Sequence, residues 1–183
     1  MAGIPLTEAI ELNANCSAFI PIGNLIASVN QRMATKVSAE HSIDLVQQFS
    51  QDVFNNREYT RMPERFAEDC VQHGPVGGME IQSLEEYEET LRMFHTAFSD
   101  LESTEEIVFS DDTGKFVCTV YTNRGTHDGE LMGIPPTHVN VEVPGIAVHR
   151  VAEGKLVETW VAADFHSLLQ QIGVAPSPDE YAA

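Results

Sequence analysis

A predicted β-hairpin near the C-terminus gathers ionisable side chains on one face. Glu153-Gly154 suits the two-residue loop of a tight hairpin, and such a loop pairs the flanking strands so that His149 lies opposite Glu158. The side chains that then share this face are those of Ala147, His149, Glu158, Trp160, Ala162 and Asp164. A histidine beside two carboxylates has its charged form favoured and can donate a hydrogen bond to a developing oxyanion. The hairpin therefore indicates general acid/base chemistry beside an aromatic wall.

Other interpretations of the same residues stay open. His149 and Glu158 can form a simple cross-strand pair on a solvated face. A one-residue bulge in the hairpin would instead place Arg150 opposite Glu158. Asp164 precedes a short helical pattern, and a carboxylate at an N-cap stabilises a helix without any role in catalysis.

Three further side chains are candidates for the same pocket. His127 ends a predicted long strand, close to a loop over 133–136 that we expect at the rim of a cavity. The alternative for His127 is a structural role in that loop. Tyr121, on the same strand, and Phe94, on a predicted long helix, are expected to contact a substrate. The other histidines have no suggestive spacing and are expected on the surface, namely His41, His95, His138 and His166.

Two long helices and a set of strands are predicted to position these residues. Apolar residues from Leu45 to Val53 recur at the spacing of a buried helix face. A second long helix begins at a capping box of Ser83 and Glu86, and its apolar stripe reaches Phe98. A short strand is expected over 106–110, and further strands over 115–124, 139–151 and 156–161.

Shorter elements complete the expected fold. Pro63 can open a short helix that contains Phe66, and a short strand over 70–73 follows it. A last helix begins at Asp164 and ends at Gly173. Helices, then antiparallel strands, then one helix predict an α+β fold with the helices on one face of a curved sheet. The expected parts are an N-terminal extension (1–38), the folded domain (39–175) and a loose tail (176–183).

Composition excludes several classes of protein. The 183 residues suffice for one domain, and 28 Asp and Glu against 10 Lys and Arg give a formal net charge of −18. Phosphate binding needs a concentrated basic surface, so we expect neither nucleic acid nor an anionic membrane as partner. No run approaches the roughly 20 apolar residues of a membrane span, and no basic residue precedes Arg32 as a signal peptide would need. The cysteines Cys16, Cys70 and Cys118 are isolated, which favours a reduced, cytoplasmic protein.

Motifs for other chemistries are missing from the sequence. No HxH, HxxxH or HExxH spacing provides metal ligands, and no GxSxG elbow presents a nucleophilic serine. No GxxxxGK loop is present to hold phosphate. We therefore expect no metal and no cofactor.

Short pieces between Phe66 and Val174 occur in the order known from one protein family. They are FAED before His73 and Pro75, AFSD after the long helix, GTH with GE, GIPPT, HR, GKLVETW, and Asp164 followed by LL, Gln171 and Gly173. In this order they resemble the SnoaL-like polyketide cyclase family, within the nuclear transport factor 2-like superfamily. The resemblance implies a cone-shaped α+β fold, in which helices pack on the concave face of a curved antiparallel sheet.

The resemblance also implies a reaction. Family enzymes close a polyketide ring by intramolecular aldol condensation without metal or Schiff base, and Asp164 matches the carboxylate that serves as acid and base. His73 matches a position near the pocket mouth. We thus expect cofactor-free acid/base chemistry on a small apolar carbonyl compound. The expected catalytic residues are Asp164, His149 and His127, and the expected substrate-binding residues are Trp160, His73, Tyr121, Phe94 and Glu158.

Two non-enzymatic functions compete with this one. A binder of a small hydrophobic ligand needs the cavity but no poised carboxylate. A structural or partner-binding domain would have its cone filled, for example by Phe19, Ile20 and Ile22 of the extension. Proteins resembling this fold commonly dimerise through the open face of the sheet, so a homodimer is expected.

Overall fold

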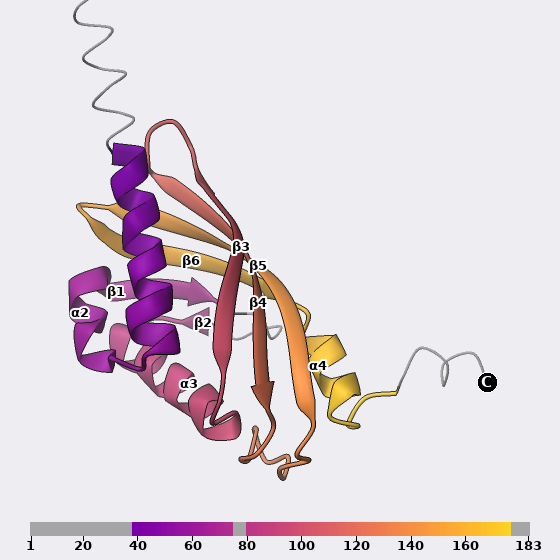
Figure 1. Cartoon of the computed structure of the whole chain (residues 1–183). Helices are drawn as coiled ribbons and strands as arrows, with labels where there is room; N and C mark the ends of the chain where they lie inside the picture. Colours follow the sequence, from indigo (N-terminus) through magenta and orange to yellow (C-terminus); the bar gives the residue numbers. More distant parts are fainter. Residues whose placement is uncertain (1–37, 75–79, 177–183) are drawn as a thin grey trace, which may run out of the picture. The chain divides into compact units, whose positions relative to one another are not determined.

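The computed structural model describes residues 38–74 and 80–176 (Figure 1). The strands in these ranges are β1 (Phe66–His73), β2 (Glu80–Ile81), β3 (Glu102–Ser110), β4 (Phe116–Thr126), β5 (Asn140–Ala152) and β6 (Lys155–Ala163). They form one six-stranded sheet in the order β2-β1-β6-β5-β4-β3. Neighbours run antiparallel except β1 and β6, which pair in parallel. The expected extension up to residue 37, with Phe19, Ile20 and Ile22, and the tail from residue 177 lie outside the described residues.

Helices cover one face of this sheet. The helical elements are an α-helix over 38–48, η1 (Phe49–Asn55), η2 (Tyr59–Arg61), α2 (Met62–Arg65), α3 (Leu84–Ala97) and α4 (Phe165–Gln171). Their apolar side chains form two clusters with inward residues of the strands, one including Val117 and Leu156 and the other Val141 and Val143. The predicted α+β fold is confirmed.

The first long helix matches its apolar pattern but changes its winding. The predicted inner positions Leu45, Val46, Phe49 and Val53 are all buried. The helix begins as an α-helix and continues as a seven-residue π-helix, η1. Such wider turns are rare and are often found beside functional sites. The hydrophobic spacing predicts where the helix lies and which side it buries, and says nothing of the π-helical turns.

The N-cap half of the predicted capping box, at Ser83, is confirmed, whereas the prediction for Phe66 is wrong. The Ser83 hydroxyl accepts a hydrogen bond from the Glu86 amide at 3.2 Å, and the Glu86 carboxylate accepts one from the Gln82 amide at 2.9 Å. Pro63 lies in the first turn of α2, as expected. Phe66 does not continue that helix, because it adopts an extended backbone and begins β1, where it is buried opposite Leu156.

The β5–β6 hairpin has the predicted loop but not the predicted register. Glu153 and Gly154 both have positive φ, 53° and 74°, as a type I′ turn requires. The two pairs next to the loop, Ala152 with Lys155 and Val151 with Leu156, have the predicted register. A bulge between Val151 and Arg150 then shifts the register by one residue and places Arg150 opposite Glu158. The prediction that His149 lies opposite Glu158 is therefore wrong, and the bulged alternative is confirmed. The bulge separates the expected cluster onto two faces of the sheet.

Candidate functional site

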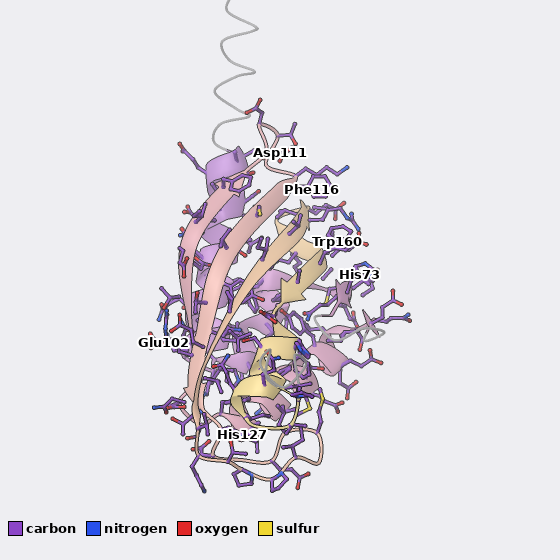
Figure 2. All side chains as sticks on the ribbon, turned by 90° about the vertical axis from the view of Figure 1, so that its right-hand side faces the viewer. His73, Glu102, Asp111, Phe116, His127 and Trp160 are labelled. Carbon is purple, nitrogen blue, oxygen red and sulfur yellow. The ribbon has the colours of Figure 1, made fainter. Side chains whose placement is uncertain are left out.

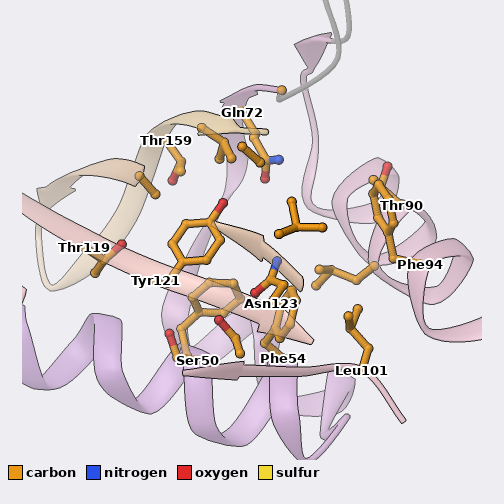
Figure 3. Close-up of a pocket in the computed structure, with 18 of the residues that line it drawn as sticks. Ser50, Phe54, Gln72, Thr90, Phe94, Leu101, Thr119, Tyr121, Asn123 and Thr159 are labelled. Atoms are coloured by element: carbon orange, nitrogen blue, oxygen red, sulfur yellow. The ribbon is translucent and has the colours of Figure 1, made fainter. Parts of the chain in front are cut away.

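A cavity of about 150 Å³ lies against the helix-covered, inner face of the sheet (Figure 3). Its walls come from all six strands and from the helical elements η1, α3 and α4. Most of its lining is apolar and much of it aromatic, including Phe49, Phe54, Phe94, Phe98 and Phe165. Such a lining removes a bound molecule from water, which strengthens any hydrogen bond or charge interaction inside.

Polar side chains interrupt this lining at a few points. Gln72 and Thr159 lie on one side, and the Tyr121 ring stands in the middle with its hydroxyl pointing toward them (Figure 3). Gln72 Oε1 and Asn123 Oδ1 are buried without a hydrogen-bond partner in the described part of the chain. Since an unpaired buried polar atom is costly, both are available to a ligand. Burial raises the pKa of Tyr121 to about 12, so its hydroxyl keeps its proton at neutral pH.

His149 faces the cavity as a neutral imidazole. Its side chain is 4% exposed, Nδ1 lies 3.1 Å from the Thr159 hydroxyl, and the ring packs edge-on against Phe49. Burial lowers the pKa of His149 to about 4. The expectation that two carboxylates favour its charged form is wrong, because the bulge turns Glu158 to the other face.

Glu105 supplies the single carboxylate among the described residues that line the cavity. It lies on β3, and the Ser50 hydroxyl on η1 donates a hydrogen bond to its Oε1 at 2.5 Å. Sequence reasoning missed Glu105 because it began this strand at residue 106, four positions after its true start at Glu102. The alternation of side chains between the two faces of a strand, followed from its true start at Glu102, could have indicated that Glu105 points inward.

Two residues of the predicted cluster, Glu158 and Trp160, lie on the outer face of the sheet. Glu158 lies 3.0 Å from His73 Nε2 and accepts a hydrogen bond from Arg150 Nε at 2.8 Å, and these two contacts lower its pKa. Trp160 stacks on His73 with ring centres 5.4 Å apart and is 37% exposed (Figure 2). Three predicted substrate-binding residues, His73, Glu158 and Trp160, thus lie together but away from the cavity lining.

Asp164 caps the last helix. Its carboxylate accepts a hydrogen bond from the Ser167 amide at 2.9 Å, which confirms the capping interpretation. The side chain is exposed, and the cavity is lined by its neighbours Ala163 and Phe165 rather than by Asp164 itself. The structure therefore does not bring this carboxylate together with His149 at the cavity.

His127 belongs to the loop after β4, away from the cavity lining. It is fully buried, and its Nδ1 accepts a hydrogen bond from the Thr137 amide at 3.3 Å. Its ring lies against Phe98, with centres 5.3 Å apart. The contacts of His127 hold together the two ends of the loop over 127–138, which is the structural role weighed above.

His95 corrects one surface prediction. Its ring is buried between Phe54 and Tyr59, with Nδ1 2.6 Å from the Tyr59 hydroxyl. Burial is the main cause that lowers the pKa of His95 to about 4. The other three histidines expected on the surface are exposed.

Metal-ligand clusters and membrane-spanning helices are absent from the described ranges, 38–74 and 80–176. They contain no group of three or more His, Cys, Asp or Glu side chains that could hold a metal ion. No helix in the same ranges is long and apolar enough to cross a membrane.

The fold and the inner cavity define an α+β protein of the cone-shaped class. Residues 44–172, well over half of the chain, match the family model for SnoaL-like polyketide cyclases. The chain therefore belongs to the SnoaL-like polyketide cyclase family. No curated protein sequence matches it.

Solved structures share this fold. A SnoaL-like protein from Jannaschia sp. CCS1, proposed to be a polyketide cyclase, superposes with a TM-score of 0.69 at 18% identity, covering 75% of this chain and 95% of the other. IdmH from Streptomyces antibioticus, also proposed to be a polyketide cyclase, superposes with a TM-score of 0.62 at 28% identity, covering 73% of this chain and 99% of IdmH. AclR from Streptomyces galilaeus, proposed to be a hydroxylase, superposes with a TM-score of 0.66 at 22% identity, covering 75% of this chain and 99% of AclR. Because these names span two chemistries, the reaction must be argued from the site.

Proposed function

We propose that this protein is a small-molecule enzyme that performs cofactor-free general acid/base chemistry, aldol-type cyclisation or a related reaction, on an apolar carbonyl compound. The observation that carries the proposal is the apolar cavity, into which one carboxylate and a few hydrogen-bonding side chains are set. Family membership and the structural likeness to proteins proposed to be polyketide cyclases support it.

The cavity favours a neutral substrate. No lysine or arginine is among the described residues that line it, and His149 is neutral there, so an anionic group would find no charged partner. A cavity of about 150 Å³ encloses the part of a ligand that is roughly the size of one aromatic ring. The acidic surface, with a formal net charge of −18, likewise supports the absence of nucleic acid and anionic membranes among its partners.

The proposed step removes a proton from the carbon beside a carbonyl group. A carboxylate accepts the proton while the C–H electron pair forms an enolate, whose negative charge collects on the substrate oxygen. Hydrogen-bond donors then stabilise that oxygen, and Tyr121 keeps its proton for this purpose. In an aldol-type cyclisation the enolate carbon next attacks a second carbonyl of the same molecule.

Proton exchange tests the proposed function directly. 2-Tetralone, an apolar bicyclic ketone, is incubated with the protein in D₂O, and loss of the proton signals beside its carbonyl is followed by NMR. Exchange well above the buffer rate, and saturable in 2-tetralone, is the expected result. A rate equal to that of buffer in the presence of bound 2-tetralone would contradict the proposal.

The resemblance makes Asp164 one candidate for the acid and base. Asn caps a helix about as well as Asp, so Asp164→Asn keeps the fold while removing the ionisable group. Loss of exchange in this variant would support the candidate. Full exchange would assign Asp164 to helix capping alone.

A non-catalytic ligand binder is the second candidate function. It is favoured by the contact of Asp164, whose carboxylate bonds to a backbone amide of α4 and lies outside the cavity lining. Saturable binding of 2-tetralone without any proton exchange would distinguish the binder from the enzyme. The partner-binding alternative depends on residues 1–37, outside the described part of the chain.

We further propose that the protein forms a homodimer through the outer face of the sheet. Large apolar side chains are exposed on strands β3, β5 and β6 of this face, namely Ile107, Phe109, Ile146 and Trp160. Their burial against a second copy would remove this apolar area from water. Light scattering at micromolar concentration tests this: a dimer is expected for the wild type and a monomer for Ile146→Glu. A monomeric wild type would contradict it.

A further inference from the structure

Two consecutive glutamates of β3 point to opposite faces of the sheet. Glu105 pairs with Tyr121 and lines the inner cavity, whereas Glu106 accepts a hydrogen bond from the Thr122 hydroxyl at 2.6 Å on the outer face. A bulge lies between Glu105 and Ile107, and Ile107 is also turned outward. Bulges recur next to active sites, where they redirect a side chain. Here the bulge turns both Glu106 and Ile107 outward, while Glu105 continues to face the cavity.

The π-helix orients this carboxylate. Ser50 lies in the first turn of η1, 55 positions before Glu105, and its hydroxyl holds Oε1 at 2.5 Å. Within residues 38–74 and 80–176, the Ser50 hydroxyl is the one hydrogen-bond partner of the Glu105 carboxylate, and it bonds to Oε1 and not to Oε2. One oxygen of Glu105 is thus anchored by protein, and the other is available to a molecule in the cavity.

We propose that Glu105 is the catalytic base of this pocket and that Ser50 is its positioning residue. This inference rests on the proposed function. Glu105 Oε2 takes the proton from the carbon beside the substrate carbonyl, the C–H bond breaks, and its electron pair passes into the enolate. The protonated Glu105 then returns a proton, which in D₂O is a deuteron, so the exchange is balanced without a further reactant. The capped, exposed Asp164 is not needed in this scheme.

The decisive experiment compares matched glutamates in the 2-tetralone exchange assay. Removal of a general base costs about 10²- to 10⁴-fold in rate, so Glu105→Gln is expected to lose at least 100-fold. Glu106→Gln, the same change one residue away on the outer face, is expected to stay within twofold of the wild type. Circular dichroism and thermal unfolding verify that both variants fold.

Other outcomes would overturn the role of Glu105 or the proposed function. If Glu105→Gln exchanges 2-tetralone at the wild-type rate, Glu105 is not the base, although the proposed function stands. If Asp164→Asn loses exchange while Glu105→Gln keeps it, the base is Asp164. If the wild type itself binds 2-tetralone without exchange, the proposed function fails and this inference fails with it.

The role of Ser50 has its own readout. Ser50→Ala is expected to lower the maximal exchange rate at least about tenfold while the half-saturating concentration of 2-tetralone changes little, because the lost hydrogen bond holds the carboxylate of Glu105 and not the ligand. Ser50→Thr retains the hydroxyl and is expected to restore most of the rate. Equal losses in both variants would overturn the positioning role, since they would reflect altered packing.

Discussion

The inner and outer faces of the sheet are built from alternate residues of the same strands, yet they differ in their access to water. On β5 and β6 the inner face carries His149 and Thr159 beside the cavity. The outer face carries Arg150 and Glu158 in an ion pair, with Trp160 exposed next to them. Neighbours in the sequence therefore occupy environments of opposite polarity.

The difference shows how water access determines the charge of each group. Burial lowers the pKa of His149 to about 4 and so leaves the imidazole neutral at neutral pH. On the outer face, hydrogen bonds from His73 and Arg150 lower the pKa of Glu158 and keep it charged. The inner face thus suits the binding of neutral molecules, and the outer face suits solvent and protein contacts.

The largest expected effect comes from filling the cavity. Ala147 is buried on the cavity wall, whereas Ala162 is exposed on the outer face of the neighbouring strand. Ala147→Phe is expected to abolish binding of 2-tetralone in a calorimetric titration, because its ring occupies the ligand's volume. Ala162→Phe should bind 2-tetralone as the wild type does. Equal affinities of the two variants would show that the ligand binds elsewhere.

A pH-dependent loss of stability is the next largest effect. The pKa of His149 is about 4 in the folded protein and near 6.5 when unfolded, so the unfolded chain binds more protons between these values. Its contribution to stability is complete above pH 6.5 and is lost as the pH falls toward 4, by about 3 kcal/mol. Urea unfolding measures the free energy of unfolding at pH 7 and at pH 4. Between these pH values His149→Leu should lose about 3 kcal/mol less of this free energy than the wild type does. A pH-independent difference would contradict the neutral, buried imidazole.

A close approach on the inner face gives a smaller effect. A Cβ on Gly145 would lie 2.5 Å from the Tyr121 ring, so Gly145→Ala must displace this ring. Overpacking of this kind costs about 1–3 kcal/mol in the free energy of unfolding. The cost should fall sharply when Tyr121→Leu has already removed the ring, a coupling that a double-mutant cycle measures. An unchanged cost in the Leu background would mean that the strain has another source.

The smallest effect is expected on the outer face. Glu158→Gln removes the charge that pairs with Arg150 and His73, and partly exposed pairs of this kind contribute only about 0.2–1 kcal/mol. Chemical denaturation should therefore show a loss within 1 kcal/mol, and the binding of 2-tetralone should not change. A loss of ligand binding would place Glu158 in the site and would contradict the separation of the two faces.

Much of the fold could be predicted because its signals are local. The N-cap at Ser83, the N-cap at Asp164 and the Glu153-Gly154 turn each depend on a few adjacent residues and are confirmed. The spacing of apolar residues also placed the buried face of the first helix correctly. Phe66 was the exception, because its pairing with Leu156, far along the chain, overrides the local helical pattern.

The site was predicted less well. Phe94, Tyr121 and His149 do line the cavity, but Trp160 and Glu158 lie on the opposite face. A single bulged residue caused this error, since strand side chains alternate with a period of two and a shift of one residue exchanges the faces.

The amino-acid sequence alone determined most of the long elements, the Ser83 and Asp164 caps, the hairpin loop and the family resemblance, since these depend on short-range spacing and on ordered motifs. The tertiary structure decided which carboxylate reaches the cavity. Glu105 is held there by Ser50, 55 positions away, while Asp164 accepts a hydrogen bond from the Ser167 amide of its own helix. Contacts between distant segments depend on strand register and on helix winding. In this protein a bulge in β3 changes the register and the π-helix η1 changes the winding, and the local sequence pattern indicates neither.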